Sequence, residues 1–262
     1  MKLSISNIGW APNDDNAVYQ LMKKYGYSGL EIAPTRIFPV SPYDKLEEAN
    51  VWSVELNKDY EFHVPSMQSI WFGRQEKIFG TEEERQILID YTKKAIDFAH
   101  IIGCKNLVFG CPRNRVFPED GDWNVAIDFF RELGEYALLK GTVIGMEANP
   151  PIYNTNFIND TNSAIELIRQ VNSEGFKLNL DVGTMIYNGE STSELKGNVR
   201  YINHVHISEP NLKPIEEREL HIKLKKVLIS EGYKGYVSIE MCKVDNLVVL
   251  DEKMKYVAGI FQ

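Results

Sequence analysis

The chain has 262 residues, of which 44% are hydrophobic and 25% are charged, and its formal net charge is −8. A chain of this length and composition can bury a large core without disulfides or a structural metal. Its acidic balance argues against broad contact with nucleic-acid phosphates, and no segment approaches the roughly 18 apolar residues of a membrane span. Three cysteines without CxxC spacing and an N-terminus without signal-peptide features predict free thiols and a cytoplasmic location.

Short β-rich segments alternate with longer amphipathic helical segments from one end of the chain to the other. We expect strands at 2–8, 28–32, 61–67, 106–110, 142–147, 176–181, 201–207 and 236–241. We expect helices near 16–25, 43–56, 81–102, 123–140, 161–171, 191–198, 216–230 and 247–258. Eight strands, each followed by a helix, predict a single-domain (β/α)₈ TIM barrel over residues 1–262. The structural alternative is a doubly wound open sheet, whose dinucleotide-binding form lacks support because no strand is followed by GxGxxG.

Four consecutive strands end with a residue of metal-binding type. Side chains alternate between the two faces of a strand, and the large apolar residues of these strands mark the face that packs on the helices. This alternation turns Glu147, Asp181, His206 and Glu240 into the barrel, each at the C-terminal end of its strand. The spacings of 34, 25 and 34 residues each match about one strand–helix unit.

These four side chains predict a divalent metal centre. Burying three carboxylates together is very unfavourable unless a cation compensates them, and barrel active sites form at the strand ends. Three carboxylates and one imidazole suit Mn²⁺ or Mg²⁺, with Co²⁺ or Zn²⁺ as alternatives.

The motifs around these residues resemble a known family. Glu147 in GMEANP, Asp181 in LNLDVGT, His206 in HVHISEPN and Glu240 in VSIEM are similar to the metal set of xylose isomerase-like TIM barrels. That superfamily includes sugar phosphate isomerases/epimerases, ketose 3-epimerases and the AP-endonuclease branch. The resemblance implies that Glu147 and Glu240 bind the metal and also act as a catalytic acid/base pair.

The same residues give a coherent chemistry. A metal that chelates a substrate carbonyl and the neighbouring hydroxyl acidifies the C–H between them and stabilises a cis-enediolate. One glutamate removes the proton, and the other returns it to the opposite face or the pair shifts the carbonyl. We therefore expect a metal-dependent sugar or sugar-phosphate isomerase/epimerase with a small carbohydrate substrate, and a homo-oligomer is left open.

Three positions depart from the epimerase pattern, which has a histidine, a glutamate and an arginine where this chain has Thr184, Tyr153 and Leu212. These positions bind the substrate in the epimerases, so the substrate is left open. An inosose-type dehydratase on the same barrel and an inactive sugar-binding barrel are the alternatives. The AP-endonuclease branch requires a histidine-rich zinc cluster, and this chain has only five histidines.

Further residues near the strand ends are candidates for substrate binding, each with a purely structural alternative. Glu31 and His63 are expected to face the interior, and Glu209 follows the strand of His206. Trp10 and Trp71 are candidates for an apolar wall against a sugar ring. Arg36, together with Arg113 and Arg115, is a candidate for binding an anionic group. His204 is expected one layer deeper than His206, in a supporting position.

Overall fold

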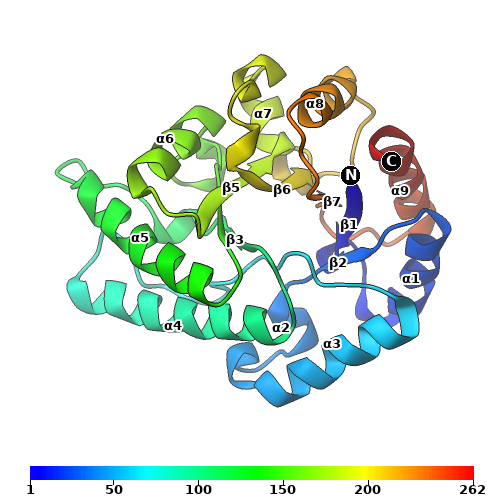
Figure 1. The fold of residues 1–262 in the computed structure, drawn as a ribbon, viewed down its shortest axis with the longest axis horizontal. Coiled ribbons are helices and arrows are strands. Elements are labelled where there is room, and N and C mark those ends of the chain that lie inside the picture. The colour runs from blue at the N-terminus through cyan, green and yellow to red at the C-terminus, as the bar shows by residue number, and fades with distance from the viewer.

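The computed structural model describes residues 1–262 as a ring of helices around a central parallel sheet (Figure 1). The seven strands are β1 (Lys2–Ser6), β2 (Gly29–Glu31), β3 (Leu107–Phe109), β4 (Ile144–Glu147), β5 (Phe176–Asp181), β6 (Ile202–Ile207) and β7 (Tyr236–Ile239). The nine α-helices are α1 (Asp15–Lys24), α2 (Pro34–Ile37), α3 (Leu46–Tyr60), α4 (Glu82–Ile101), α5 (Trp123–Leu139), α6 (Thr161–Val171), α7 (Val182–Asn188), α8 (Glu219–Ser230) and α9 (Leu247–Phe261). The strand order is β2-β1-β7-β6-β5-β4-β3, and every pairing is parallel. The predicted TIM barrel is confirmed.

The third predicted strand, 61–67, is not a regular strand. It closes the barrel between β2 and β3 only through isolated bridges, which pair His63 with Gly29 and Met67 with both Ile32 and Leu107. Pro65 lies in the middle of this segment and has no backbone N–H to give to a ladder, which accounts for the interruption. The segment remains attached on both sides, because the Met67 N–H donates to Asn106 O at 2.9 Å and the Val108 N–H donates to Met67 O at 2.8 Å.

Apolar side chains fill the layer between the sheet and the helices. Leu178 and Leu180 of β5 are each 1% exposed and belong to a core of 64 buried residues. The inside of the barrel is different, because polar side chains occupy it, among them Glu31, Asn179 and His204. Barrel interiors are usually filled by branched apolar residues. In this protein, by contrast, hydrogen-bonded polar side chains form the layer of the barrel interior that lies under the mouth.

Two predicted helices begin later than expected, and a third is not formed in its predicted range. The helix predicted at 43–56 begins later, at Leu46, and continues to Tyr60, where Glu61 takes a left-handed φ of 61°. The helix predicted at 216–230 begins only at Glu219, because residue 218 is extended. Only a 3₁₀ turn, Thr192–Leu195, lies in the range 191–198, and the helix of this unit is α7, which starts directly after β5.

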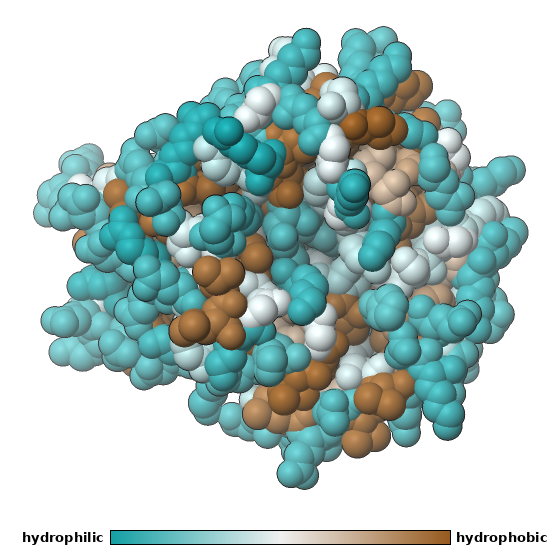
Figure 2. Space-filling model, in the orientation of Figure 1, coloured by the Kyte–Doolittle hydropathy of each residue, from teal (hydrophilic) through white to brown (hydrophobic).

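The surface shows no continuous apolar face in the view of Figure 2, where hydrophilic residues predominate and hydrophobic residues form separate groups. None of the helices combines the length and the apolar character that a membrane crossing requires.

Candidate metal centre

The four residues predicted as ligands lie together at the mouth of the barrel. Glu147 ends β4, Asp181 ends β5, His206 lies near the end of β6, and Glu240 follows β7. One carboxylate oxygen or ring nitrogen from each lies within 4.8 Å of the others. The His206 Nδ1 atom is 2.9 Å from Glu147 Oε1 and 3.1 Å from Glu240 Oε2. The sheet register therefore brings four donors from separate strands to a common point.

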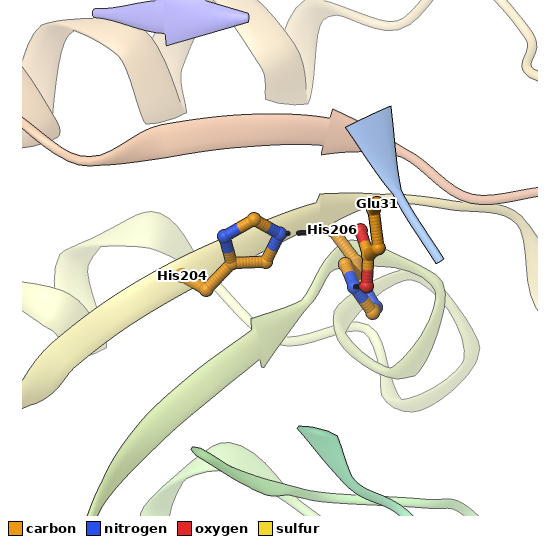
Figure 3. Close-up of side chains that lie close together, drawn as sticks. All are labelled: Glu31, His204 and His206. Atoms are coloured by element: carbon orange, nitrogen blue, oxygen red, sulfur yellow. Dashed lines mark hydrogen bonds and ion pairs between the residues drawn. The ribbon is translucent and has the colours of Figure 1, made fainter. Parts of the chain in front are cut away.

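Glu31 points toward the His206 ring and fixes its orientation (Figure 3). It comes from β2, is completely buried, and accepts a hydrogen bond of 2.8 Å from His206 Nε2. His204 Nε2 at 3.3 Å and the hydroxyls of Ser66 at 3.1 Å and Ser238 at 2.5 Å complete its contacts. Burial favours the neutral acid, but the charges and hydrogen bonds of the two histidines hold the pKa of Glu31 well below its usual range. An ionised Glu31 keeps the Nε2 proton of His206, so Nδ1 is the nitrogen that faces the other three donors.

Glu31, His204 and His206 also meet the distance condition for a metal site, but they do not form an accessible one. Their separations are those of ordinary hydrogen bonds, and none of the three lines the cavity at the mouth. We interpret this cluster as the support of His206.

The Glu147 carboxylate is held by two amide groups. Asn179 Nδ2 donates to Oε1 at 2.8 Å, and Asn149 Nδ2 donates to Oε2 at 3.2 Å. Asn149 in turn accepts from Arg115, whose guanidinium is fully buried. Burial lowers the pKa of Arg115 to about 10, so it is a cation at neutral pH.

Asp181 both ends its strand and starts the next helix. Its Oδ1 accepts from the backbone N–H of Thr184 at 2.6 Å, which makes it the N-cap of α7. Its Oδ2 accepts from the Ser208 hydroxyl, and the same hydroxyl accepts from the Gly183 N–H at 2.8 Å. This capping arrangement restricts Asp181 to one orientation.

The electrostatics of the cluster indicate a compensating cation. Burial, together with the charge of Glu147, raises the pKa of Asp181 to about 6. Burial raises the pKa of Glu240 to about 7, in spite of the opposing charge of His206. Burial favours neutral His206, but Glu240, Glu31 and Glu147 outweigh it and hold the pKa of His206 well above its usual range. Without a metal, protons on these side chains balance the buried negative charge. A divalent ion would supply the same positive charge, so the donor set fits such an ion.

A cavity of about 240 Å³ opens directly above these donors. The carboxylates of Glu147, Asp181 and Glu240 reach it, and Glu209 borders it while pairing with Arg218 at 2.6 Å. The remaining lining residues are Ile8, Gln68, Ser69, Val108, Gly110, Cys111, Pro112, Asn149, Tyr153 and Leu212. The lining includes no lysine or arginine.

Five of the six predicted substrate-binding residues do not line this cavity. The expectation that His63 faces inward is wrong: its side chain is exposed and contacts Asn57 Nδ2 at 3.3 Å. Trp71 is a core residue that donates to Thr92 at 2.8 Å, so it forms no wall at the mouth.

Trp10 and Arg36 also lie away from the cavity. Trp10 is buried and donates to Asp15 at 2.7 Å, and the Arg36 guanidinium pairs with the same carboxylate at 2.6 Å. Arg36 is therefore already neutralised by a protein partner. Of the predicted set, only Glu209 borders the cavity, while Glu31 lies beneath the donors.

Sequence reasoning missed the amides that hold Glu147. Strand alternation places Asn179 inside the barrel, two residues before Asp181, so the signal for it was present. Asn149 and Tyr153 lie in the connection after β4, where the alternation of side chains along a strand no longer predicts their direction.

Fold and site together define an α/β barrel with a candidate metal centre at the C-terminal ends of its strands. A family model described as xylose isomerase-like TIM barrel matches residues 19–259. The chain therefore belongs to this family. No curated protein matches it by sequence.

Several solved structures share the fold. 3-Keto-D-glucoside 4-epimerase from E. coli is 19% identical, with 99% of each chain covered and a TM-score of 0.78. D-Psicose 3-epimerase from Clostridium cellulolyticum H10, solved with D-tagatose, is 16% identical, with 100% of each chain covered and a TM-score of 0.78. An AP endonuclease, family 2, from Brucella melitensis is 20% identical, with 99% of each chain covered and a TM-score of 0.74. At these identities the likeness shows the fold.

Proposed function

We propose that the protein is a divalent-metal-dependent isomerase or epimerase of a small carbohydrate. The observation that carries this proposal is the convergence of three carboxylates and one imidazole within 4.8 Å beneath a cavity at the barrel mouth. Two of the structures that share the fold are named as sugar epimerases, which agrees with this assignment.

The donor chemistry favours Mn²⁺ or Mg²⁺. Glu147, Asp181 and Glu240 supply oxygen, and His206 supplies Nδ1, a mostly hard set that suits these ions. When bound, such an ion supplies Lewis-acid polarisation of a substrate carbonyl and its neighbouring hydroxyl.

The two glutamates carry the proton transfer. One carboxylate takes the proton from the carbon beside the carbonyl, and the electron pair of that C–H bond becomes the double bond of a cis-enediolate. The other glutamate gives a proton to the opposite face of the same carbon, which inverts it, or to the neighbouring carbon, which moves the carbonyl. Glu147 ends β4 and Glu240 directly follows β7, and β5 and β6 lie between these two strands in the sheet, so the two glutamates reach the cavity from different sides.

The lining favours an uncharged monosaccharide over a sugar phosphate. Arg218 pairs with Glu209, and Arg115 is fully buried, so neither is available to a substrate anion. The cavity, at about 240 Å³, is smaller than the sites of drug-sized ligands, which start at about 300 Å³. The three unpaired cysteines agree with the proposed cytoplasmic location.

The test is proton exchange in deuterated water with the Mn²⁺-loaded protein and D-fructose, D-psicose, D-tagatose and 3-keto-D-glucose. We expect deuterium at one carbon of at least one sugar, together with its epimer or isomer, and loss of both in Glu147→Gln and Glu240→Gln. Loss of water from the substrate would instead identify a dehydratase. Mn²⁺ binding without any exchange would identify a barrel that binds but does not turn over.

A further inference from the structure

Arg115 is a buried cation without an anionic side chain in contact. It is 0% exposed, and its Nη2 donates to the Glu147 backbone O at 2.9 Å and to Asn149 Oδ1 at 2.7 Å. Nη1 faces Met146 Sδ at 3.6 Å, and Nε has no partner. Burial of an unpaired charge costs several kcal/mol unless neighbouring charges compensate it. The charge of nearby Glu147 opposes the effect of burial on the pKa of Arg115 and so supplies part of that compensation.

Arg115 decides which end of the Asn149 amide faces the metal centre. The guanidinium can only donate, so it takes the Asn149 Oδ1 atom. The amide nitrogen must then point the other way, where it donates to Glu147 Oε2 at 3.2 Å. In the reverse orientation, the amide nitrogen of Asn149 would face the Arg115 guanidinium, which is also a donor. The amide oxygen would then face Glu147 Oε2, which is also an acceptor. Arg115 therefore sets the hydrogen bond that Glu147 receives, although it does not touch the carboxylate.

The two glutamates differ in how firmly they are held. Glu147 receives amide donors at both oxygens, from Asn149 and from Asn179 at 2.8 Å. The Glu240 carboxylate has His206 Nδ1, at 3.1 Å, as its protein partner. A carboxylate held from two sides has little freedom to rotate, which fixes its geometry toward a metal and a substrate proton.

We propose that Arg115, acting through Asn149, is a positioning residue that holds the Glu147 carboxylate for metal binding and for proton transfer on one face of the substrate. The catalytic part of this inference rests on the proposed isomerase or epimerase function, and the metal-binding part does not. Its specific consequence is asymmetry, because the pair supports Glu147 and leaves Glu240 untouched.

The test compares Asn149→Ala and Arg115→Met with Thr92→Val, a control that removes a buried hydrogen bond between Thr92 and Trp71, neither of which lines the cavity. Mn²⁺ affinity is measured by titration calorimetry on the folded, metal-free proteins. We expect a loss of about tenfold in Asn149→Ala, within the roughly 10–100-fold range for residues that orient metal ligands. Thr92→Val should bind Mn²⁺ as the native protein does. If Arg115→Met folds, we expect it to lose Mn²⁺ affinity as Asn149→Ala does. If Arg115→Met does not fold, the Mn²⁺ affinity of Asn149→Ala decides whether the proposal stands.

The second measurement is deuterium exchange, started separately from D-fructose and D-psicose or from the epimer pair that the native protein interconverts. Exchange from one epimer should fall about tenfold more than exchange from the other in Asn149→Ala, because each glutamate faces one epimer's proton. Native Mn²⁺ affinity in Asn149→Ala, or an equal fall for both epimers, would overturn the proposal. A native protein that binds Mn²⁺ and exchanges neither sugar would sink the proposed function instead, while the affinities would still decide the role of Arg115.

Discussion

Replacing Glu31 by glutamine tests whether this buried carboxylate orients His206. Glu31 accepts four hydrogen bonds, of which that from His206 Nε2 is 2.8 Å long. Glutamine keeps the volume but replaces one acceptor oxygen by a donor and removes the charge. A hydrogen bond to a charged group is worth about 1.5–3 kcal/mol. Since about 1.4 kcal/mol is a factor of ten, Mn²⁺ affinity should fall roughly 10–100-fold.

Titration calorimetry of the metal-free protein with Mn²⁺ measures this loss directly. Ser66→Ala is the matched control: it removes the 3.1 Å bond to Glu31 and the 3.0 Å bond from Asn106, and it leaves the bond between His206 and Glu31 in place. We expect less than a threefold change in that variant, because Glu31 keeps both its charge and its bond to His206. A folded Glu31→Gln protein with native Mn²⁺ affinity would refute the orienting role.

Three further outcomes follow from the site. Because the pKa of Asp181 is raised to about 6 and that of Glu240 to about 7, the metal-free fold should lose stability as pH rises from about 4, the value in unfolded chains, through 7. The Mn²⁺-induced rise in melting temperature should therefore be larger at pH 8 than at pH 5, and equal rises would contradict these shifts. Gly110→Ala places a Cβ about 3.0 Å from Glu147 Oε2, so Mn²⁺ affinity measured by calorimetry should drop severalfold; native affinity would show that the carboxylate yields. Tyr153→Phe removes the acceptor of a 2.8 Å bond from a backbone N–H in the loop after β6, so KM should rise about fivefold, for about 1 kcal/mol, with a smaller change in kcat, and an unchanged KM would exclude a role in shaping the cavity.

Strand alternation was sufficient to predict that Glu147, Asp181, His206 and Glu240 lie together at the mouth of the barrel. Within β4–β7 the residues that pack on the helices are large and apolar, so the opposite phase is fixed by a period of two. A slip of one residue would bury Glu147 against the helices and expose Met146 to the interior. The sequence therefore determines both the direction of these side chains and the end of the barrel at which they meet.

The same reasoning failed where the period is broken. The segment 61–67 is not a regular strand, and His63 in it is exposed and contacts Asn57. Trp71 and Arg36 lie in the connections after predicted strands, but their side chains do not point to the barrel mouth. Trp71 donates to Thr92, and Arg36 pairs with Asp15. Direction in a connection is decided by tertiary packing, which no local pattern encodes.

The interior amides show why the polar layer under the mouth belongs to the site. Asn203 Nδ2 donates to Asn106 Oδ1 at 2.9 Å, Asn106 Nδ2 to Asn179 Oδ1 at 3.3 Å, and Asn179 Nδ2 to Glu147 Oε1 at 2.8 Å. Each amide thus fixes the orientation of the next, and the chain ends with a donor on the carboxylate. At residue 145 a Cβ would lie 2.5 Å from Asn106 Oδ1, so the glycine there makes room for this chain. An apolar interior would support the barrel equally well, but it could not supply a directed donor to Glu147. The polar layer therefore holds the Glu147 carboxylate in one orientation, which apolar packing at this place would not do.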